Sequence, residues 1–216
     1  MKPKTILFQG DSITDCGRSR ENDSDMGMGY PTMVKGELGL EYPGQYTFLN
    51  RGISGDRIVD IYARIKADII NLKPDYMSIL IGVNDVWHEL GGCCNGVSAE
   101  KYEKIYGMLI EEIQEALPDI RIMLLEPFVL EASATRNTEE EPARWHIFHT
   151  EVRARAAAAR RTAEKYHLTF VPLQDNFDAA CTRAESSWWL GDGVHPTAMG
   201  HCLIKNEWMD VFCRGI

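Results

Sequence analysis

The expected fold follows from the stretch Thr5-Ile6-Leu7-Phe8-Gln9-Gly10-Asp11-Ser12-Ile13-Thr14-Asp15. Its first half is a short apolar run typical of a buried strand, and its second half is a small polar turn. Gly10 permits a tight turn, so we expect Ser12 to lie where the strand ends and a helix begins. Ligands bind at this carboxyl end of the strands in an open parallel sheet. Ser12 is therefore a candidate nucleophile, provided that another part of the chain supplies a base.

The same alternation of apolar runs and helical patterns continues along the chain. Strands are predicted at 4–9, 46–50, 76–81, 121–126 and 168–171, and helices at 57–72, 98–117, 142–166 and 197–212. Ser98 is a plausible N-cap of the second helix, and Pro118 ends it. Strands that alternate with helices favour βαβ units and a parallel sheet that is covered on both faces. We therefore expect a three-layer α/β/α sandwich with a five-stranded sheet.

A candidate base lies near the end of the chain, in Asp192-Gly193-Val194-His195-Pro196. Gly and Pro favour a shaped loop over a helix, and such a loop can present His195 together with Asp192. A serine, a histidine and an aspartate form the acyl-transfer constellation, which is recognised by roles and not by order in the chain. Taken singly, each piece has a more ordinary interpretation, because Ser12 suits a helix N-cap and Asp-Gly is a common turn.

Two further polar segments follow predicted strands. Asn50-Arg51-Gly52-Ile53-Ser54-Gly55 comes after the strand at 46–50, and Gly82-Val83-Asn84-Asp85 comes after the strand at 76–81. A glycine N–H and an asparagine amide are suitable donors for a developing oxyanion. The ordinary alternatives are a turn that requires a positive φ at Gly52 and an Asx motif at Asn84.

Together, the segments around Ser12, Gly52, Asn84 and His195 resemble the four blocks of the GDSL hydrolases, also called SGNH hydrolases. The resemblance runs from residue 6 to about residue 200, with Ile13 where the family name has Leu. It implies a flavodoxin-like architecture and an enzyme, a carboxylic ester hydrolase. By this resemblance Ser12 is the nucleophile, His195 the general base and Asp192 its orienting carboxylate. The implied oxyanion donors are the Ser12 N–H, the Gly52 N–H and the Asn84 side chain.

Several side chains next to these blocks are candidate substrate contacts, because aromatic faces beside a polar site suit sugar rings or a short acyl pocket. The predicted set is Asp11, Asp85, Trp87, Trp188 and Trp189. For at least one of the tryptophans, core packing is the alternative. We expect a serine esterase for short acyl groups, chiefly acetyl, on sugars or oligosaccharides. Two alternatives remain: a lysophospholipase or acyl thioesterase, and a catalytically silent carbohydrate-binding relative.

Composition limits the classes of partner. The chain has 216 residues and a formal net charge of −9, which suits one domain over residues 1–216 and gives no basic patch for nucleic acid. No stretch is long enough to span a membrane, and no motif indicates a metal or other cofactor. The apolar run near the start is too short for a signal peptide, so we expect a cytoplasmic enzyme. A homo-oligomer remains compatible with the sequence.

One segment is too long for a tight loop, from Pro127 to Glu141. Long connections in compact domains are often functional. Two interpretations remain open: a lid or oligomer contact, and a solvated acidic loop.

Overall fold

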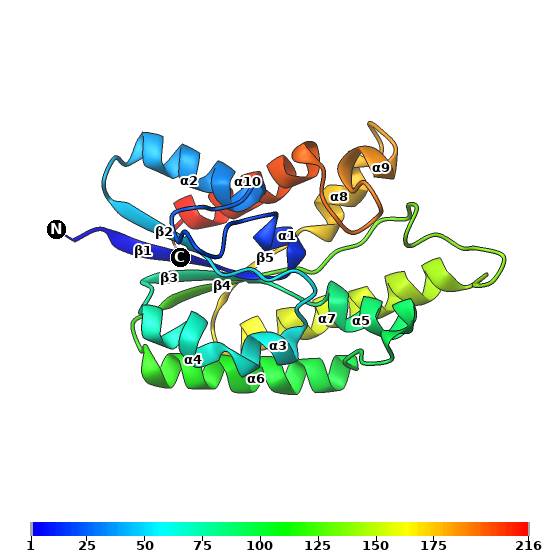
Figure 1. Cartoon of the computed structure of the whole chain (residues 1–216), viewed down its shortest axis with the longest axis horizontal. Coiled ribbons are helices and arrows are strands. Elements are labelled where there is room, and N and C mark those ends of the chain that lie inside the picture. The colour runs from blue at the N-terminus through cyan, green and yellow to red at the C-terminus, as the bar shows by residue number, and fades with distance from the viewer. Residues whose placement is uncertain (1, 216) are drawn as a thin grey trace.

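The computed structural model describes residues 2–215, which form a twisted parallel sheet between two layers of helices (Figure 1). Within these residues the sheet has five strands in the order β2-β1-β3-β4-β5. The strands are β1 (Lys4–Gly10), β2 (Tyr46–Asn50), β3 (Tyr76–Leu80), β4 (Arg121–Leu125) and β5 (Thr169–Val171). All four neighbouring pairs are parallel, so the expected α/β class and five-stranded sheet are confirmed.

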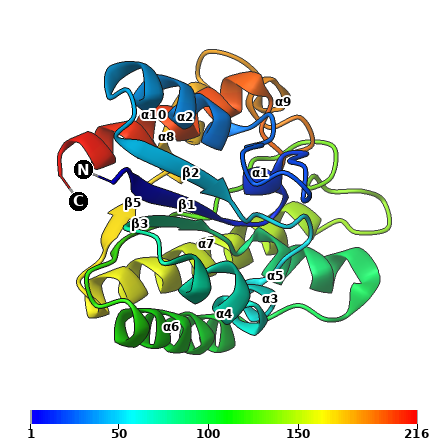
Figure 2. The ribbon, with the colours of Figure 1, turned by 60° about the vertical axis from the view of Figure 1, so that its left-hand side comes forward.

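The helices lie on both faces of the sheet (Figure 2). One layer contains α2 (Tyr30–Glu41), α8 (Gln174–Ala180), α9 (Ser186–Trp189) and α10 (Ala198–Cys213). The other contains α3 (Ile58–Ala63), α4 (Ile65–Asp68), α5 (Val83–His88), α6 (Ala99–Ala116) and α7 (Arg144–Lys165). Three short elements complete the set: α1 (Ser12–Asp15), the 3-10 turn η1 (Ile70–Leu72) and the π-helical η2 (Glu89–Cys93). None of the helices in residues 2–215 combines the length and the apolar character that a membrane span requires.

The central strands are largely apolar because both of their faces are covered. In β1, Ile6 and Phe8 pack into the core beneath α2 and α10, while Leu7 packs into the core above α3 and α6. In β4, Met123 packs on the α2 and α10 side and Leu124 on the α3 and α6 side. This alternation between two buried faces is what a parallel sheet in a three-layer sandwich requires.

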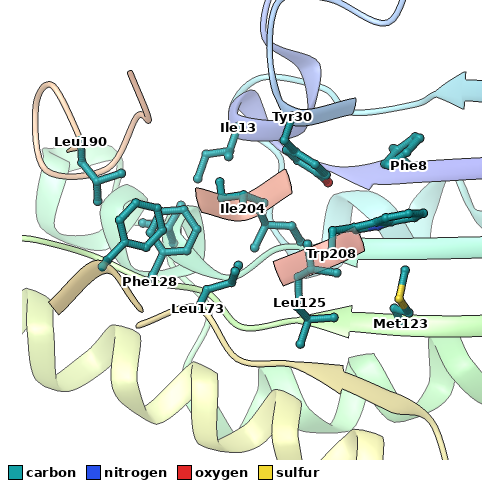
Figure 3. Close-up of a cluster of buried hydrophobic side chains, with 14 of the residues drawn as sticks. Phe8, Ile13, Tyr30, Met123, Leu125, Phe128, Leu173, Leu190, Ile204 and Trp208 are labelled. Atoms are coloured by element: carbon teal, nitrogen blue, oxygen red, sulfur yellow. The ribbon is translucent and has the colours of Figure 1, made fainter. Parts of the chain in front are cut away.

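Several aromatic rings pack among aliphatic side chains in the core on the α2 and α10 side of the sheet (Figure 3). The Trp208 ring lies 5.5 Å from Phe8 and 4.7 Å from Phe212, measured between ring centroids. Tyr30 meets Phe8 edge to face at 5.8 Å. Helices α2 and α10 are thereby held against β1, the strand that leads to Ser12.

The predicted element boundaries agree with the structure at most positions. All five strands lie where they were expected, and Ser98 accepts a hydrogen bond from the Lys101 N–H as the N-cap of α6. The helix expected at 57–72 is wrong as a single element, because the chain leaves helical geometry at Arg64 and Ile69 and forms α3, α4 and η1. The prediction also missed the short helices α5, α8 and α9 and the longer helix α2. Its start signal is Pro31 in the first turn, but two glycines within it weaken the helical pattern.

The order of the strands explains where a site can form. From β1 the chain moves outward to β2 and then crosses back to β3 on the other side of β1. The direction of winding therefore reverses between β1 and β3, and a crevice opens at the carboxyl ends of such a pair. Gly10 pairs with Leu80 across these two strands. As a result, Ser12 and Asn84, which follow them, emerge on the same edge.

Candidate active site

Ser12, His195 and Asp192 form one hydrogen-bonded line, although the first two are 183 positions apart. Ser12 Oγ lies 2.9 Å from His195 Nε2, and His195 Nδ1 lies 2.7 Å from Asp192 Oδ2. A carboxylate can only accept, so the ring proton faces Asp192 and Nε2 carries the lone pair that faces Ser12. This arrangement suits removal of the Ser12 proton by His195, the step that turns a serine into a nucleophile.

The charges of Asp192 and His195 favour the orientation in which the ring proton of His195 faces Asp192. Partial burial opposes ionisation of Asp192, but hydrogen bonds from the His195 ring and from the N–H groups of His195 and Val194 outweigh it and lower the pKa of Asp192 to about 2. The hydrogen bond to Asp192 raises the pKa of His195, against the opposing effect of burial. Asp192 is thus ionised at neutral pH and stabilises the protonated imidazole.

The loop that carries Asp192 and His195 is supported by the segment at 127–141. The Leu130 N–H donates to the Gly193 carbonyl and the Ala134 N–H donates to the Asp192 carbonyl, both at 2.9 Å. Gly193 has a φ of +100°, and a Cβ there would lie 2.5 Å from the Leu130 carbonyl oxygen. Phe128 and Leu130 are buried, whereas residues 136–142 are exposed. The first part of this segment therefore packs against the loop that carries Asp192 and His195 and stabilises it.

The structure contradicts the prediction for Gly52 as an oxyanion donor. Its N–H donates to Asn50 Oδ1 at 2.9 Å, and its carbonyl accepts from Arg18 Nε at 2.9 Å. A Cβ at this position would lie 2.4 Å from the Asp15 N atom. Gly52 is needed because the loop after β2 passes directly against α1. Its N–H is already bonded to the Asn50 side chain at the end of β2.

Gly55, three positions after Gly52 in the same block, lies at the pocket where Gly52 was expected. It lines a pocket of about 440 Å³ together with Ser12, Asn84, Trp87 and His195. Its φ of +88° requires glycine, and nothing lies within 4 Å of where its Cβ would be, so it faces open space. The sequence signal was available, since Gly55 is the second glycine of the same block.

Two other donors face this pocket. Ser12 is the first residue of α1, so its N–H is among those that a helix leaves without an intrahelical partner. Asn84 Nδ2 donates one hydrogen to the Asp56 carbonyl at 3.1 Å, which fixes the amide and leaves its second hydrogen for a ligand.

The predicted substrate contacts through Asp11 and Asp85 are wrong, because both carboxyl groups are buried and serve the backbone. Asp11 Oδ1 accepts from the Ile13 N–H at 3.0 Å as the N-cap of α1. Asp85 accepts from the Ile58 N–H at the start of α3. Burial raises the pKa of Asp11 to about 7 and that of Asp85 to about 8, although these N–H groups act in the opposite direction.

The three candidate tryptophans divide between the pocket, the surface and the core. The Trp87 ring lies 5.7 Å from the His195 ring and forms a wall of the pocket. Trp189 is 8% exposed and packs in the core with the Arg183 guanidinium 5.0 Å above its ring, so its prediction as a substrate contact is wrong. Trp188 is 52% exposed on α9 and does not belong to the described residues that line the pocket.

No group of three or more His, Cys, Asp or Glu side chains within residues 2–215 is placed to hold a metal ion.

Comparison with known proteins agrees with this geometry. The sequence model described as the GDSL-like lipase/acylhydrolase family matches residues 8–203. An acetylxylan esterase from Geobacillus stearothermophilus is 31% identical over 212 residues, which cover 94% of this chain and 91% of that protein.

Solved structures give the same picture. A protein from Parabacteroides merdae described as a GDSL-like lipase superposes with a TM-score of 0.88 at 37% identity, over 97% of this chain and 95% of that one. The acetylxylan esterase Axe2 from G. stearothermophilus superposes with a TM-score of 0.82 at 30% identity, over 100% of this chain and 97% of that one. Its solved structures include catalytic mutants in which a serine, an aspartate or a histidine is replaced by alanine. The replaced aspartate and histidine lie three positions apart in that protein.

Proposed function

The chain belongs to the GDSL-like lipase/acylhydrolase family and is a carboxylic ester hydrolase, and on that premise we propose that it removes short acyl groups, chiefly acetyl, from sugars or oligosaccharides. The reaction would proceed through an acyl-enzyme on Ser12.

The observation that carries this proposal is the line from Ser12 Oγ through the His195 ring to Asp192. The same aspartate–histidine spacing occurs in the catalytic mutants of the acetylxylan esterase Axe2. A base at hydrogen-bond distance from a serine hydroxyl, itself oriented by a carboxylate, is the arrangement that activates a serine nucleophile. The depressed pKa of Asp192 supports the role of orienting carboxylate.

In the proposed mechanism, His195 Nε2 takes the Ser12 proton as Oγ attacks the ester carbonyl. The carbonyl oxygen becomes an oxyanion, held by the N–H groups of Ser12 and Gly55 and by Asn84 Nδ2. The tetrahedral intermediate collapses, and the alcohol leaves with the proton from His195. Water then gives a proton to His195 and attacks the acyl carbon, and His195 returns this proton to Ser12 Oγ as the acid leaves.

The preference for a short acyl group rests on Trp87 and on the acetylxylan esterase relative. The Trp87 ring is wedged between the His195 ring and Phe148, at centroid distances of 5.7 Å and 5.9 Å. The pocket of about 440 Å³ is in the range of small-ligand sites and is shared between the acyl group and the alcohol.

The proposal is tested by kcat/KM on nitrophenyl acetate, butyrate and octanoate, followed by acetate release from acetylated xylo-oligosaccharides, with Ser12→Ala as the blank. We expect acetate to be the best acyl group and all turnover to be lost in the blank. A preference for octanoate would indicate a lysophospholipase or acyl thioesterase. Binding of the oligosaccharide without serine-dependent hydrolysis would indicate a catalytically silent binding protein.

A further inference from the structure

His88 is a polar side chain of the pocket that the proposed mechanism does not use. It is the last residue of α5, and it lines the pocket together with Ser12, Asn84 and His195. Asn84 lies four positions earlier on the same helix, and residues four apart share one helix face. His88 therefore lies one turn beyond the proposed oxyanion donor, on the side of the helix that faces the pocket.

The two ring nitrogens of His88 have different surroundings. Nδ1 is buried and has no hydrogen-bond partner within residues 2–215. Nε2 is not one of these buried atoms, and no described residue forms a hydrogen bond with it, so it is the open polar atom of the ring. In the neutral ring a hydrogen on Nδ1 would have no acceptor, whereas a hydrogen on Nε2 is available to water or a ligand. The protonated ring carries a hydrogen on Nε2 as well, so the pocket gains an N–H donor in either state.

The wall that carries His88 is held on both sides of this residue. The Asp85 carbonyl accepts from the Val97 N–H at 2.9 Å, and Glu89 Oε2 accepts from the Gly96 N–H at 3.0 Å. The chain after η2 thus returns to α5 just before and just after His88. The donor is therefore in place before a ligand binds, which lowers the entropic cost of using it.

The distance from the ester determines which part of a substrate reaches His88. The methyl carbon of an acetyl group lies one bond, about 1.5 Å, from the carbonyl carbon. Residues four apart on a helix are separated by about 5–6 Å between their Cβ atoms. His88 is thus farther from Asn84 than an acetyl group extends, and the alcohol part of the ester is the part that reaches it. In a sugar ester this part carries hydroxyl, ring and glycosidic oxygens, all of which accept hydrogen bonds.

We propose that His88 is a specificity-determining residue whose Nε2–H donates to an oxygen of the sugar that bears the acetyl group. This inference rests on the proposed function, because it concerns the alcohol of the same reaction. Trp87, the preceding residue, supplies an apolar wall next to the His195 ring. His88 adds a polar contact to this wall, and the enzyme should therefore distinguish a sugar ester from an ester whose alcohol lacks further oxygens.

The decisive variant is His88→Phe, which keeps an aromatic ring and removes the N–H donor. His88→Leu is a second variant without a donor, to be used if the phenylalanine variant does not fold. His88→Gln is the conservative variant, because its side-chain amide supplies an N–H in place of Nε2. The control is His167→Asn, which removes another imidazole. His167 lies just before β5, at the amino edge of the sheet and away from the pocket, and asparagine tolerates its φ of +56°.

The measurement is kcat and KM on acetylated xylo-oligosaccharides and on phenyl acetate, whose alcohol part has no oxygen besides that of the ester. We expect His88→Phe to lower kcat/KM on the oligosaccharides by about three- to tenfold, the scale of one neutral hydrogen bond. The loss should appear mainly in KM, because the contact is present before and during the reaction. Turnover of phenyl acetate should stay unchanged, which also shows that Ser12 and His195 are intact. His88→Gln should recover most of the loss, and His167→Asn should behave like wild type on both esters.

No loss in His88→Phe, or an equal loss on both esters, would overturn the inference and leave the sugar esterase in place. A change confined to the ratio of phenyl butyrate to phenyl acetate would also overturn it, because it would place His88 beside the acyl group. If the wild-type enzyme hydrolyses phenyl acetate but no acetylated sugar, the proposed function fails and the inference fails with it. That result is seen in the wild type alone, so it is distinguished from a failure that concerns His88 only.

Discussion

The Asn84 amide is held in place by one hydrogen bond and keeps a second N–H hydrogen for a ligand. Its amide nitrogen donates one hydrogen to the Asp56 carbonyl, and the residue lines the pocket beside Ser12. The amide is therefore oriented before any substrate binds. Preorganised donors of this kind stabilise the transition state more than the bound ester.

We therefore predict that Asn84→Ala lowers kcat by about 10²–10³ and changes KM little, the scale for loss of one oxyanion donor. Steady-state kinetics on nitrophenyl acetate measure both constants. Asn176→Ala is the matched control, since its amide also donates to a backbone carbonyl, that of Pro172, but on α8. A loss of less than tenfold in Asn84→Ala would mean that Asn84 is not a donor to the oxyanion.

His195 should set the acid limb of the pH profile. Its pKa is raised by the hydrogen bond to Asp192, so the neutral, basic form is lost as the pH falls through a value above the ordinary 6.5. We predict that kcat/KM declines below this point, and that Asp192→Asn lowers the rate and moves the decline to lower pH. A profile that stays flat between pH 5 and pH 8 would exclude His195 as the base.

At the scale of elements, α1 and the loop after β2 are tied together by Asp15. Its Oδ2 accepts from the Ser54 N–H and from Ser54 Oγ, at 3.1 Å and 3.2 Å. This contact holds the residue before Gly55 against the helix that begins with Ser12. Two blocks that are about forty positions apart thus become one wall of the pocket.

Another contact between elements joins α10 to α2. The Tyr30 N–H, at the start of α2, donates to His201 Nδ1 at 3.1 Å, and the first helical turn thereby gains an acceptor. Burial, assisted by repulsion from His195, lowers the pKa of His201 to about 4. The folded protein therefore keeps this ring neutral where the unfolded chain, with an ordinary pKa near 6.5, already takes up a proton.

The consequence is a pH-dependent stability. Between pH 6.5 and pH 4 the unfolded state binds more protons than the folded state, so stability falls as the pH is lowered. We predict that His201 contributes a loss of about 2 kcal/mol between pH 7.5 and pH 5. His201→Asn, whose Oδ1 can replace Nδ1 as acceptor, should lack this contribution. Urea unfolding at both pH values measures the difference.

His146→Asn, on the exposed side of α7, is the control for the substitution itself. It should retain the pH dependence of the parent protein. Equal pH dependence in His201→Asn and the parent would show that His201 is not the responsible group.

At the scale of the whole molecule, stability and reactivity are located at different places. The aromatic core around Trp208 lies between the sheet and the α2 and α10 layer (Figure 3), whereas the pocket is at the carboxyl edge. We predict that Trp208→Ala lowers the free energy of unfolding by about 3–5 kcal/mol, because it leaves a cavity in a close-packed core. Trp188→Ala, at a half-exposed position, should cost less than about 1 kcal/mol. Denaturant unfolding compares the two, and similar losses would contradict this division.

The sequence by itself determined the layers, the strands and the segments that meet at the site. Apolar runs of strand length and stripes at helical spacing are local patterns, and the edge on which parallel strands end follows from their direction. Ser12, Asn84 and the Asp192–His195 pair could be selected for this reason. The missed helix α2 and the breaks at Arg64 and Ile69 show where local patterns were too weak.

Only the tertiary structure decided which polar groups face the pocket. Gly52 and Gly55 lie in one block, but Asn50 accepts from the N–H of the first, and the second lines the pocket. Asp11 lies next to Ser12 in sequence, yet its carboxyl is turned inward to cap α1. Availability of an N–H or a carboxyl depends on partners brought from elsewhere in the chain, and those partners are set by packing between elements and not by spacing along the sequence.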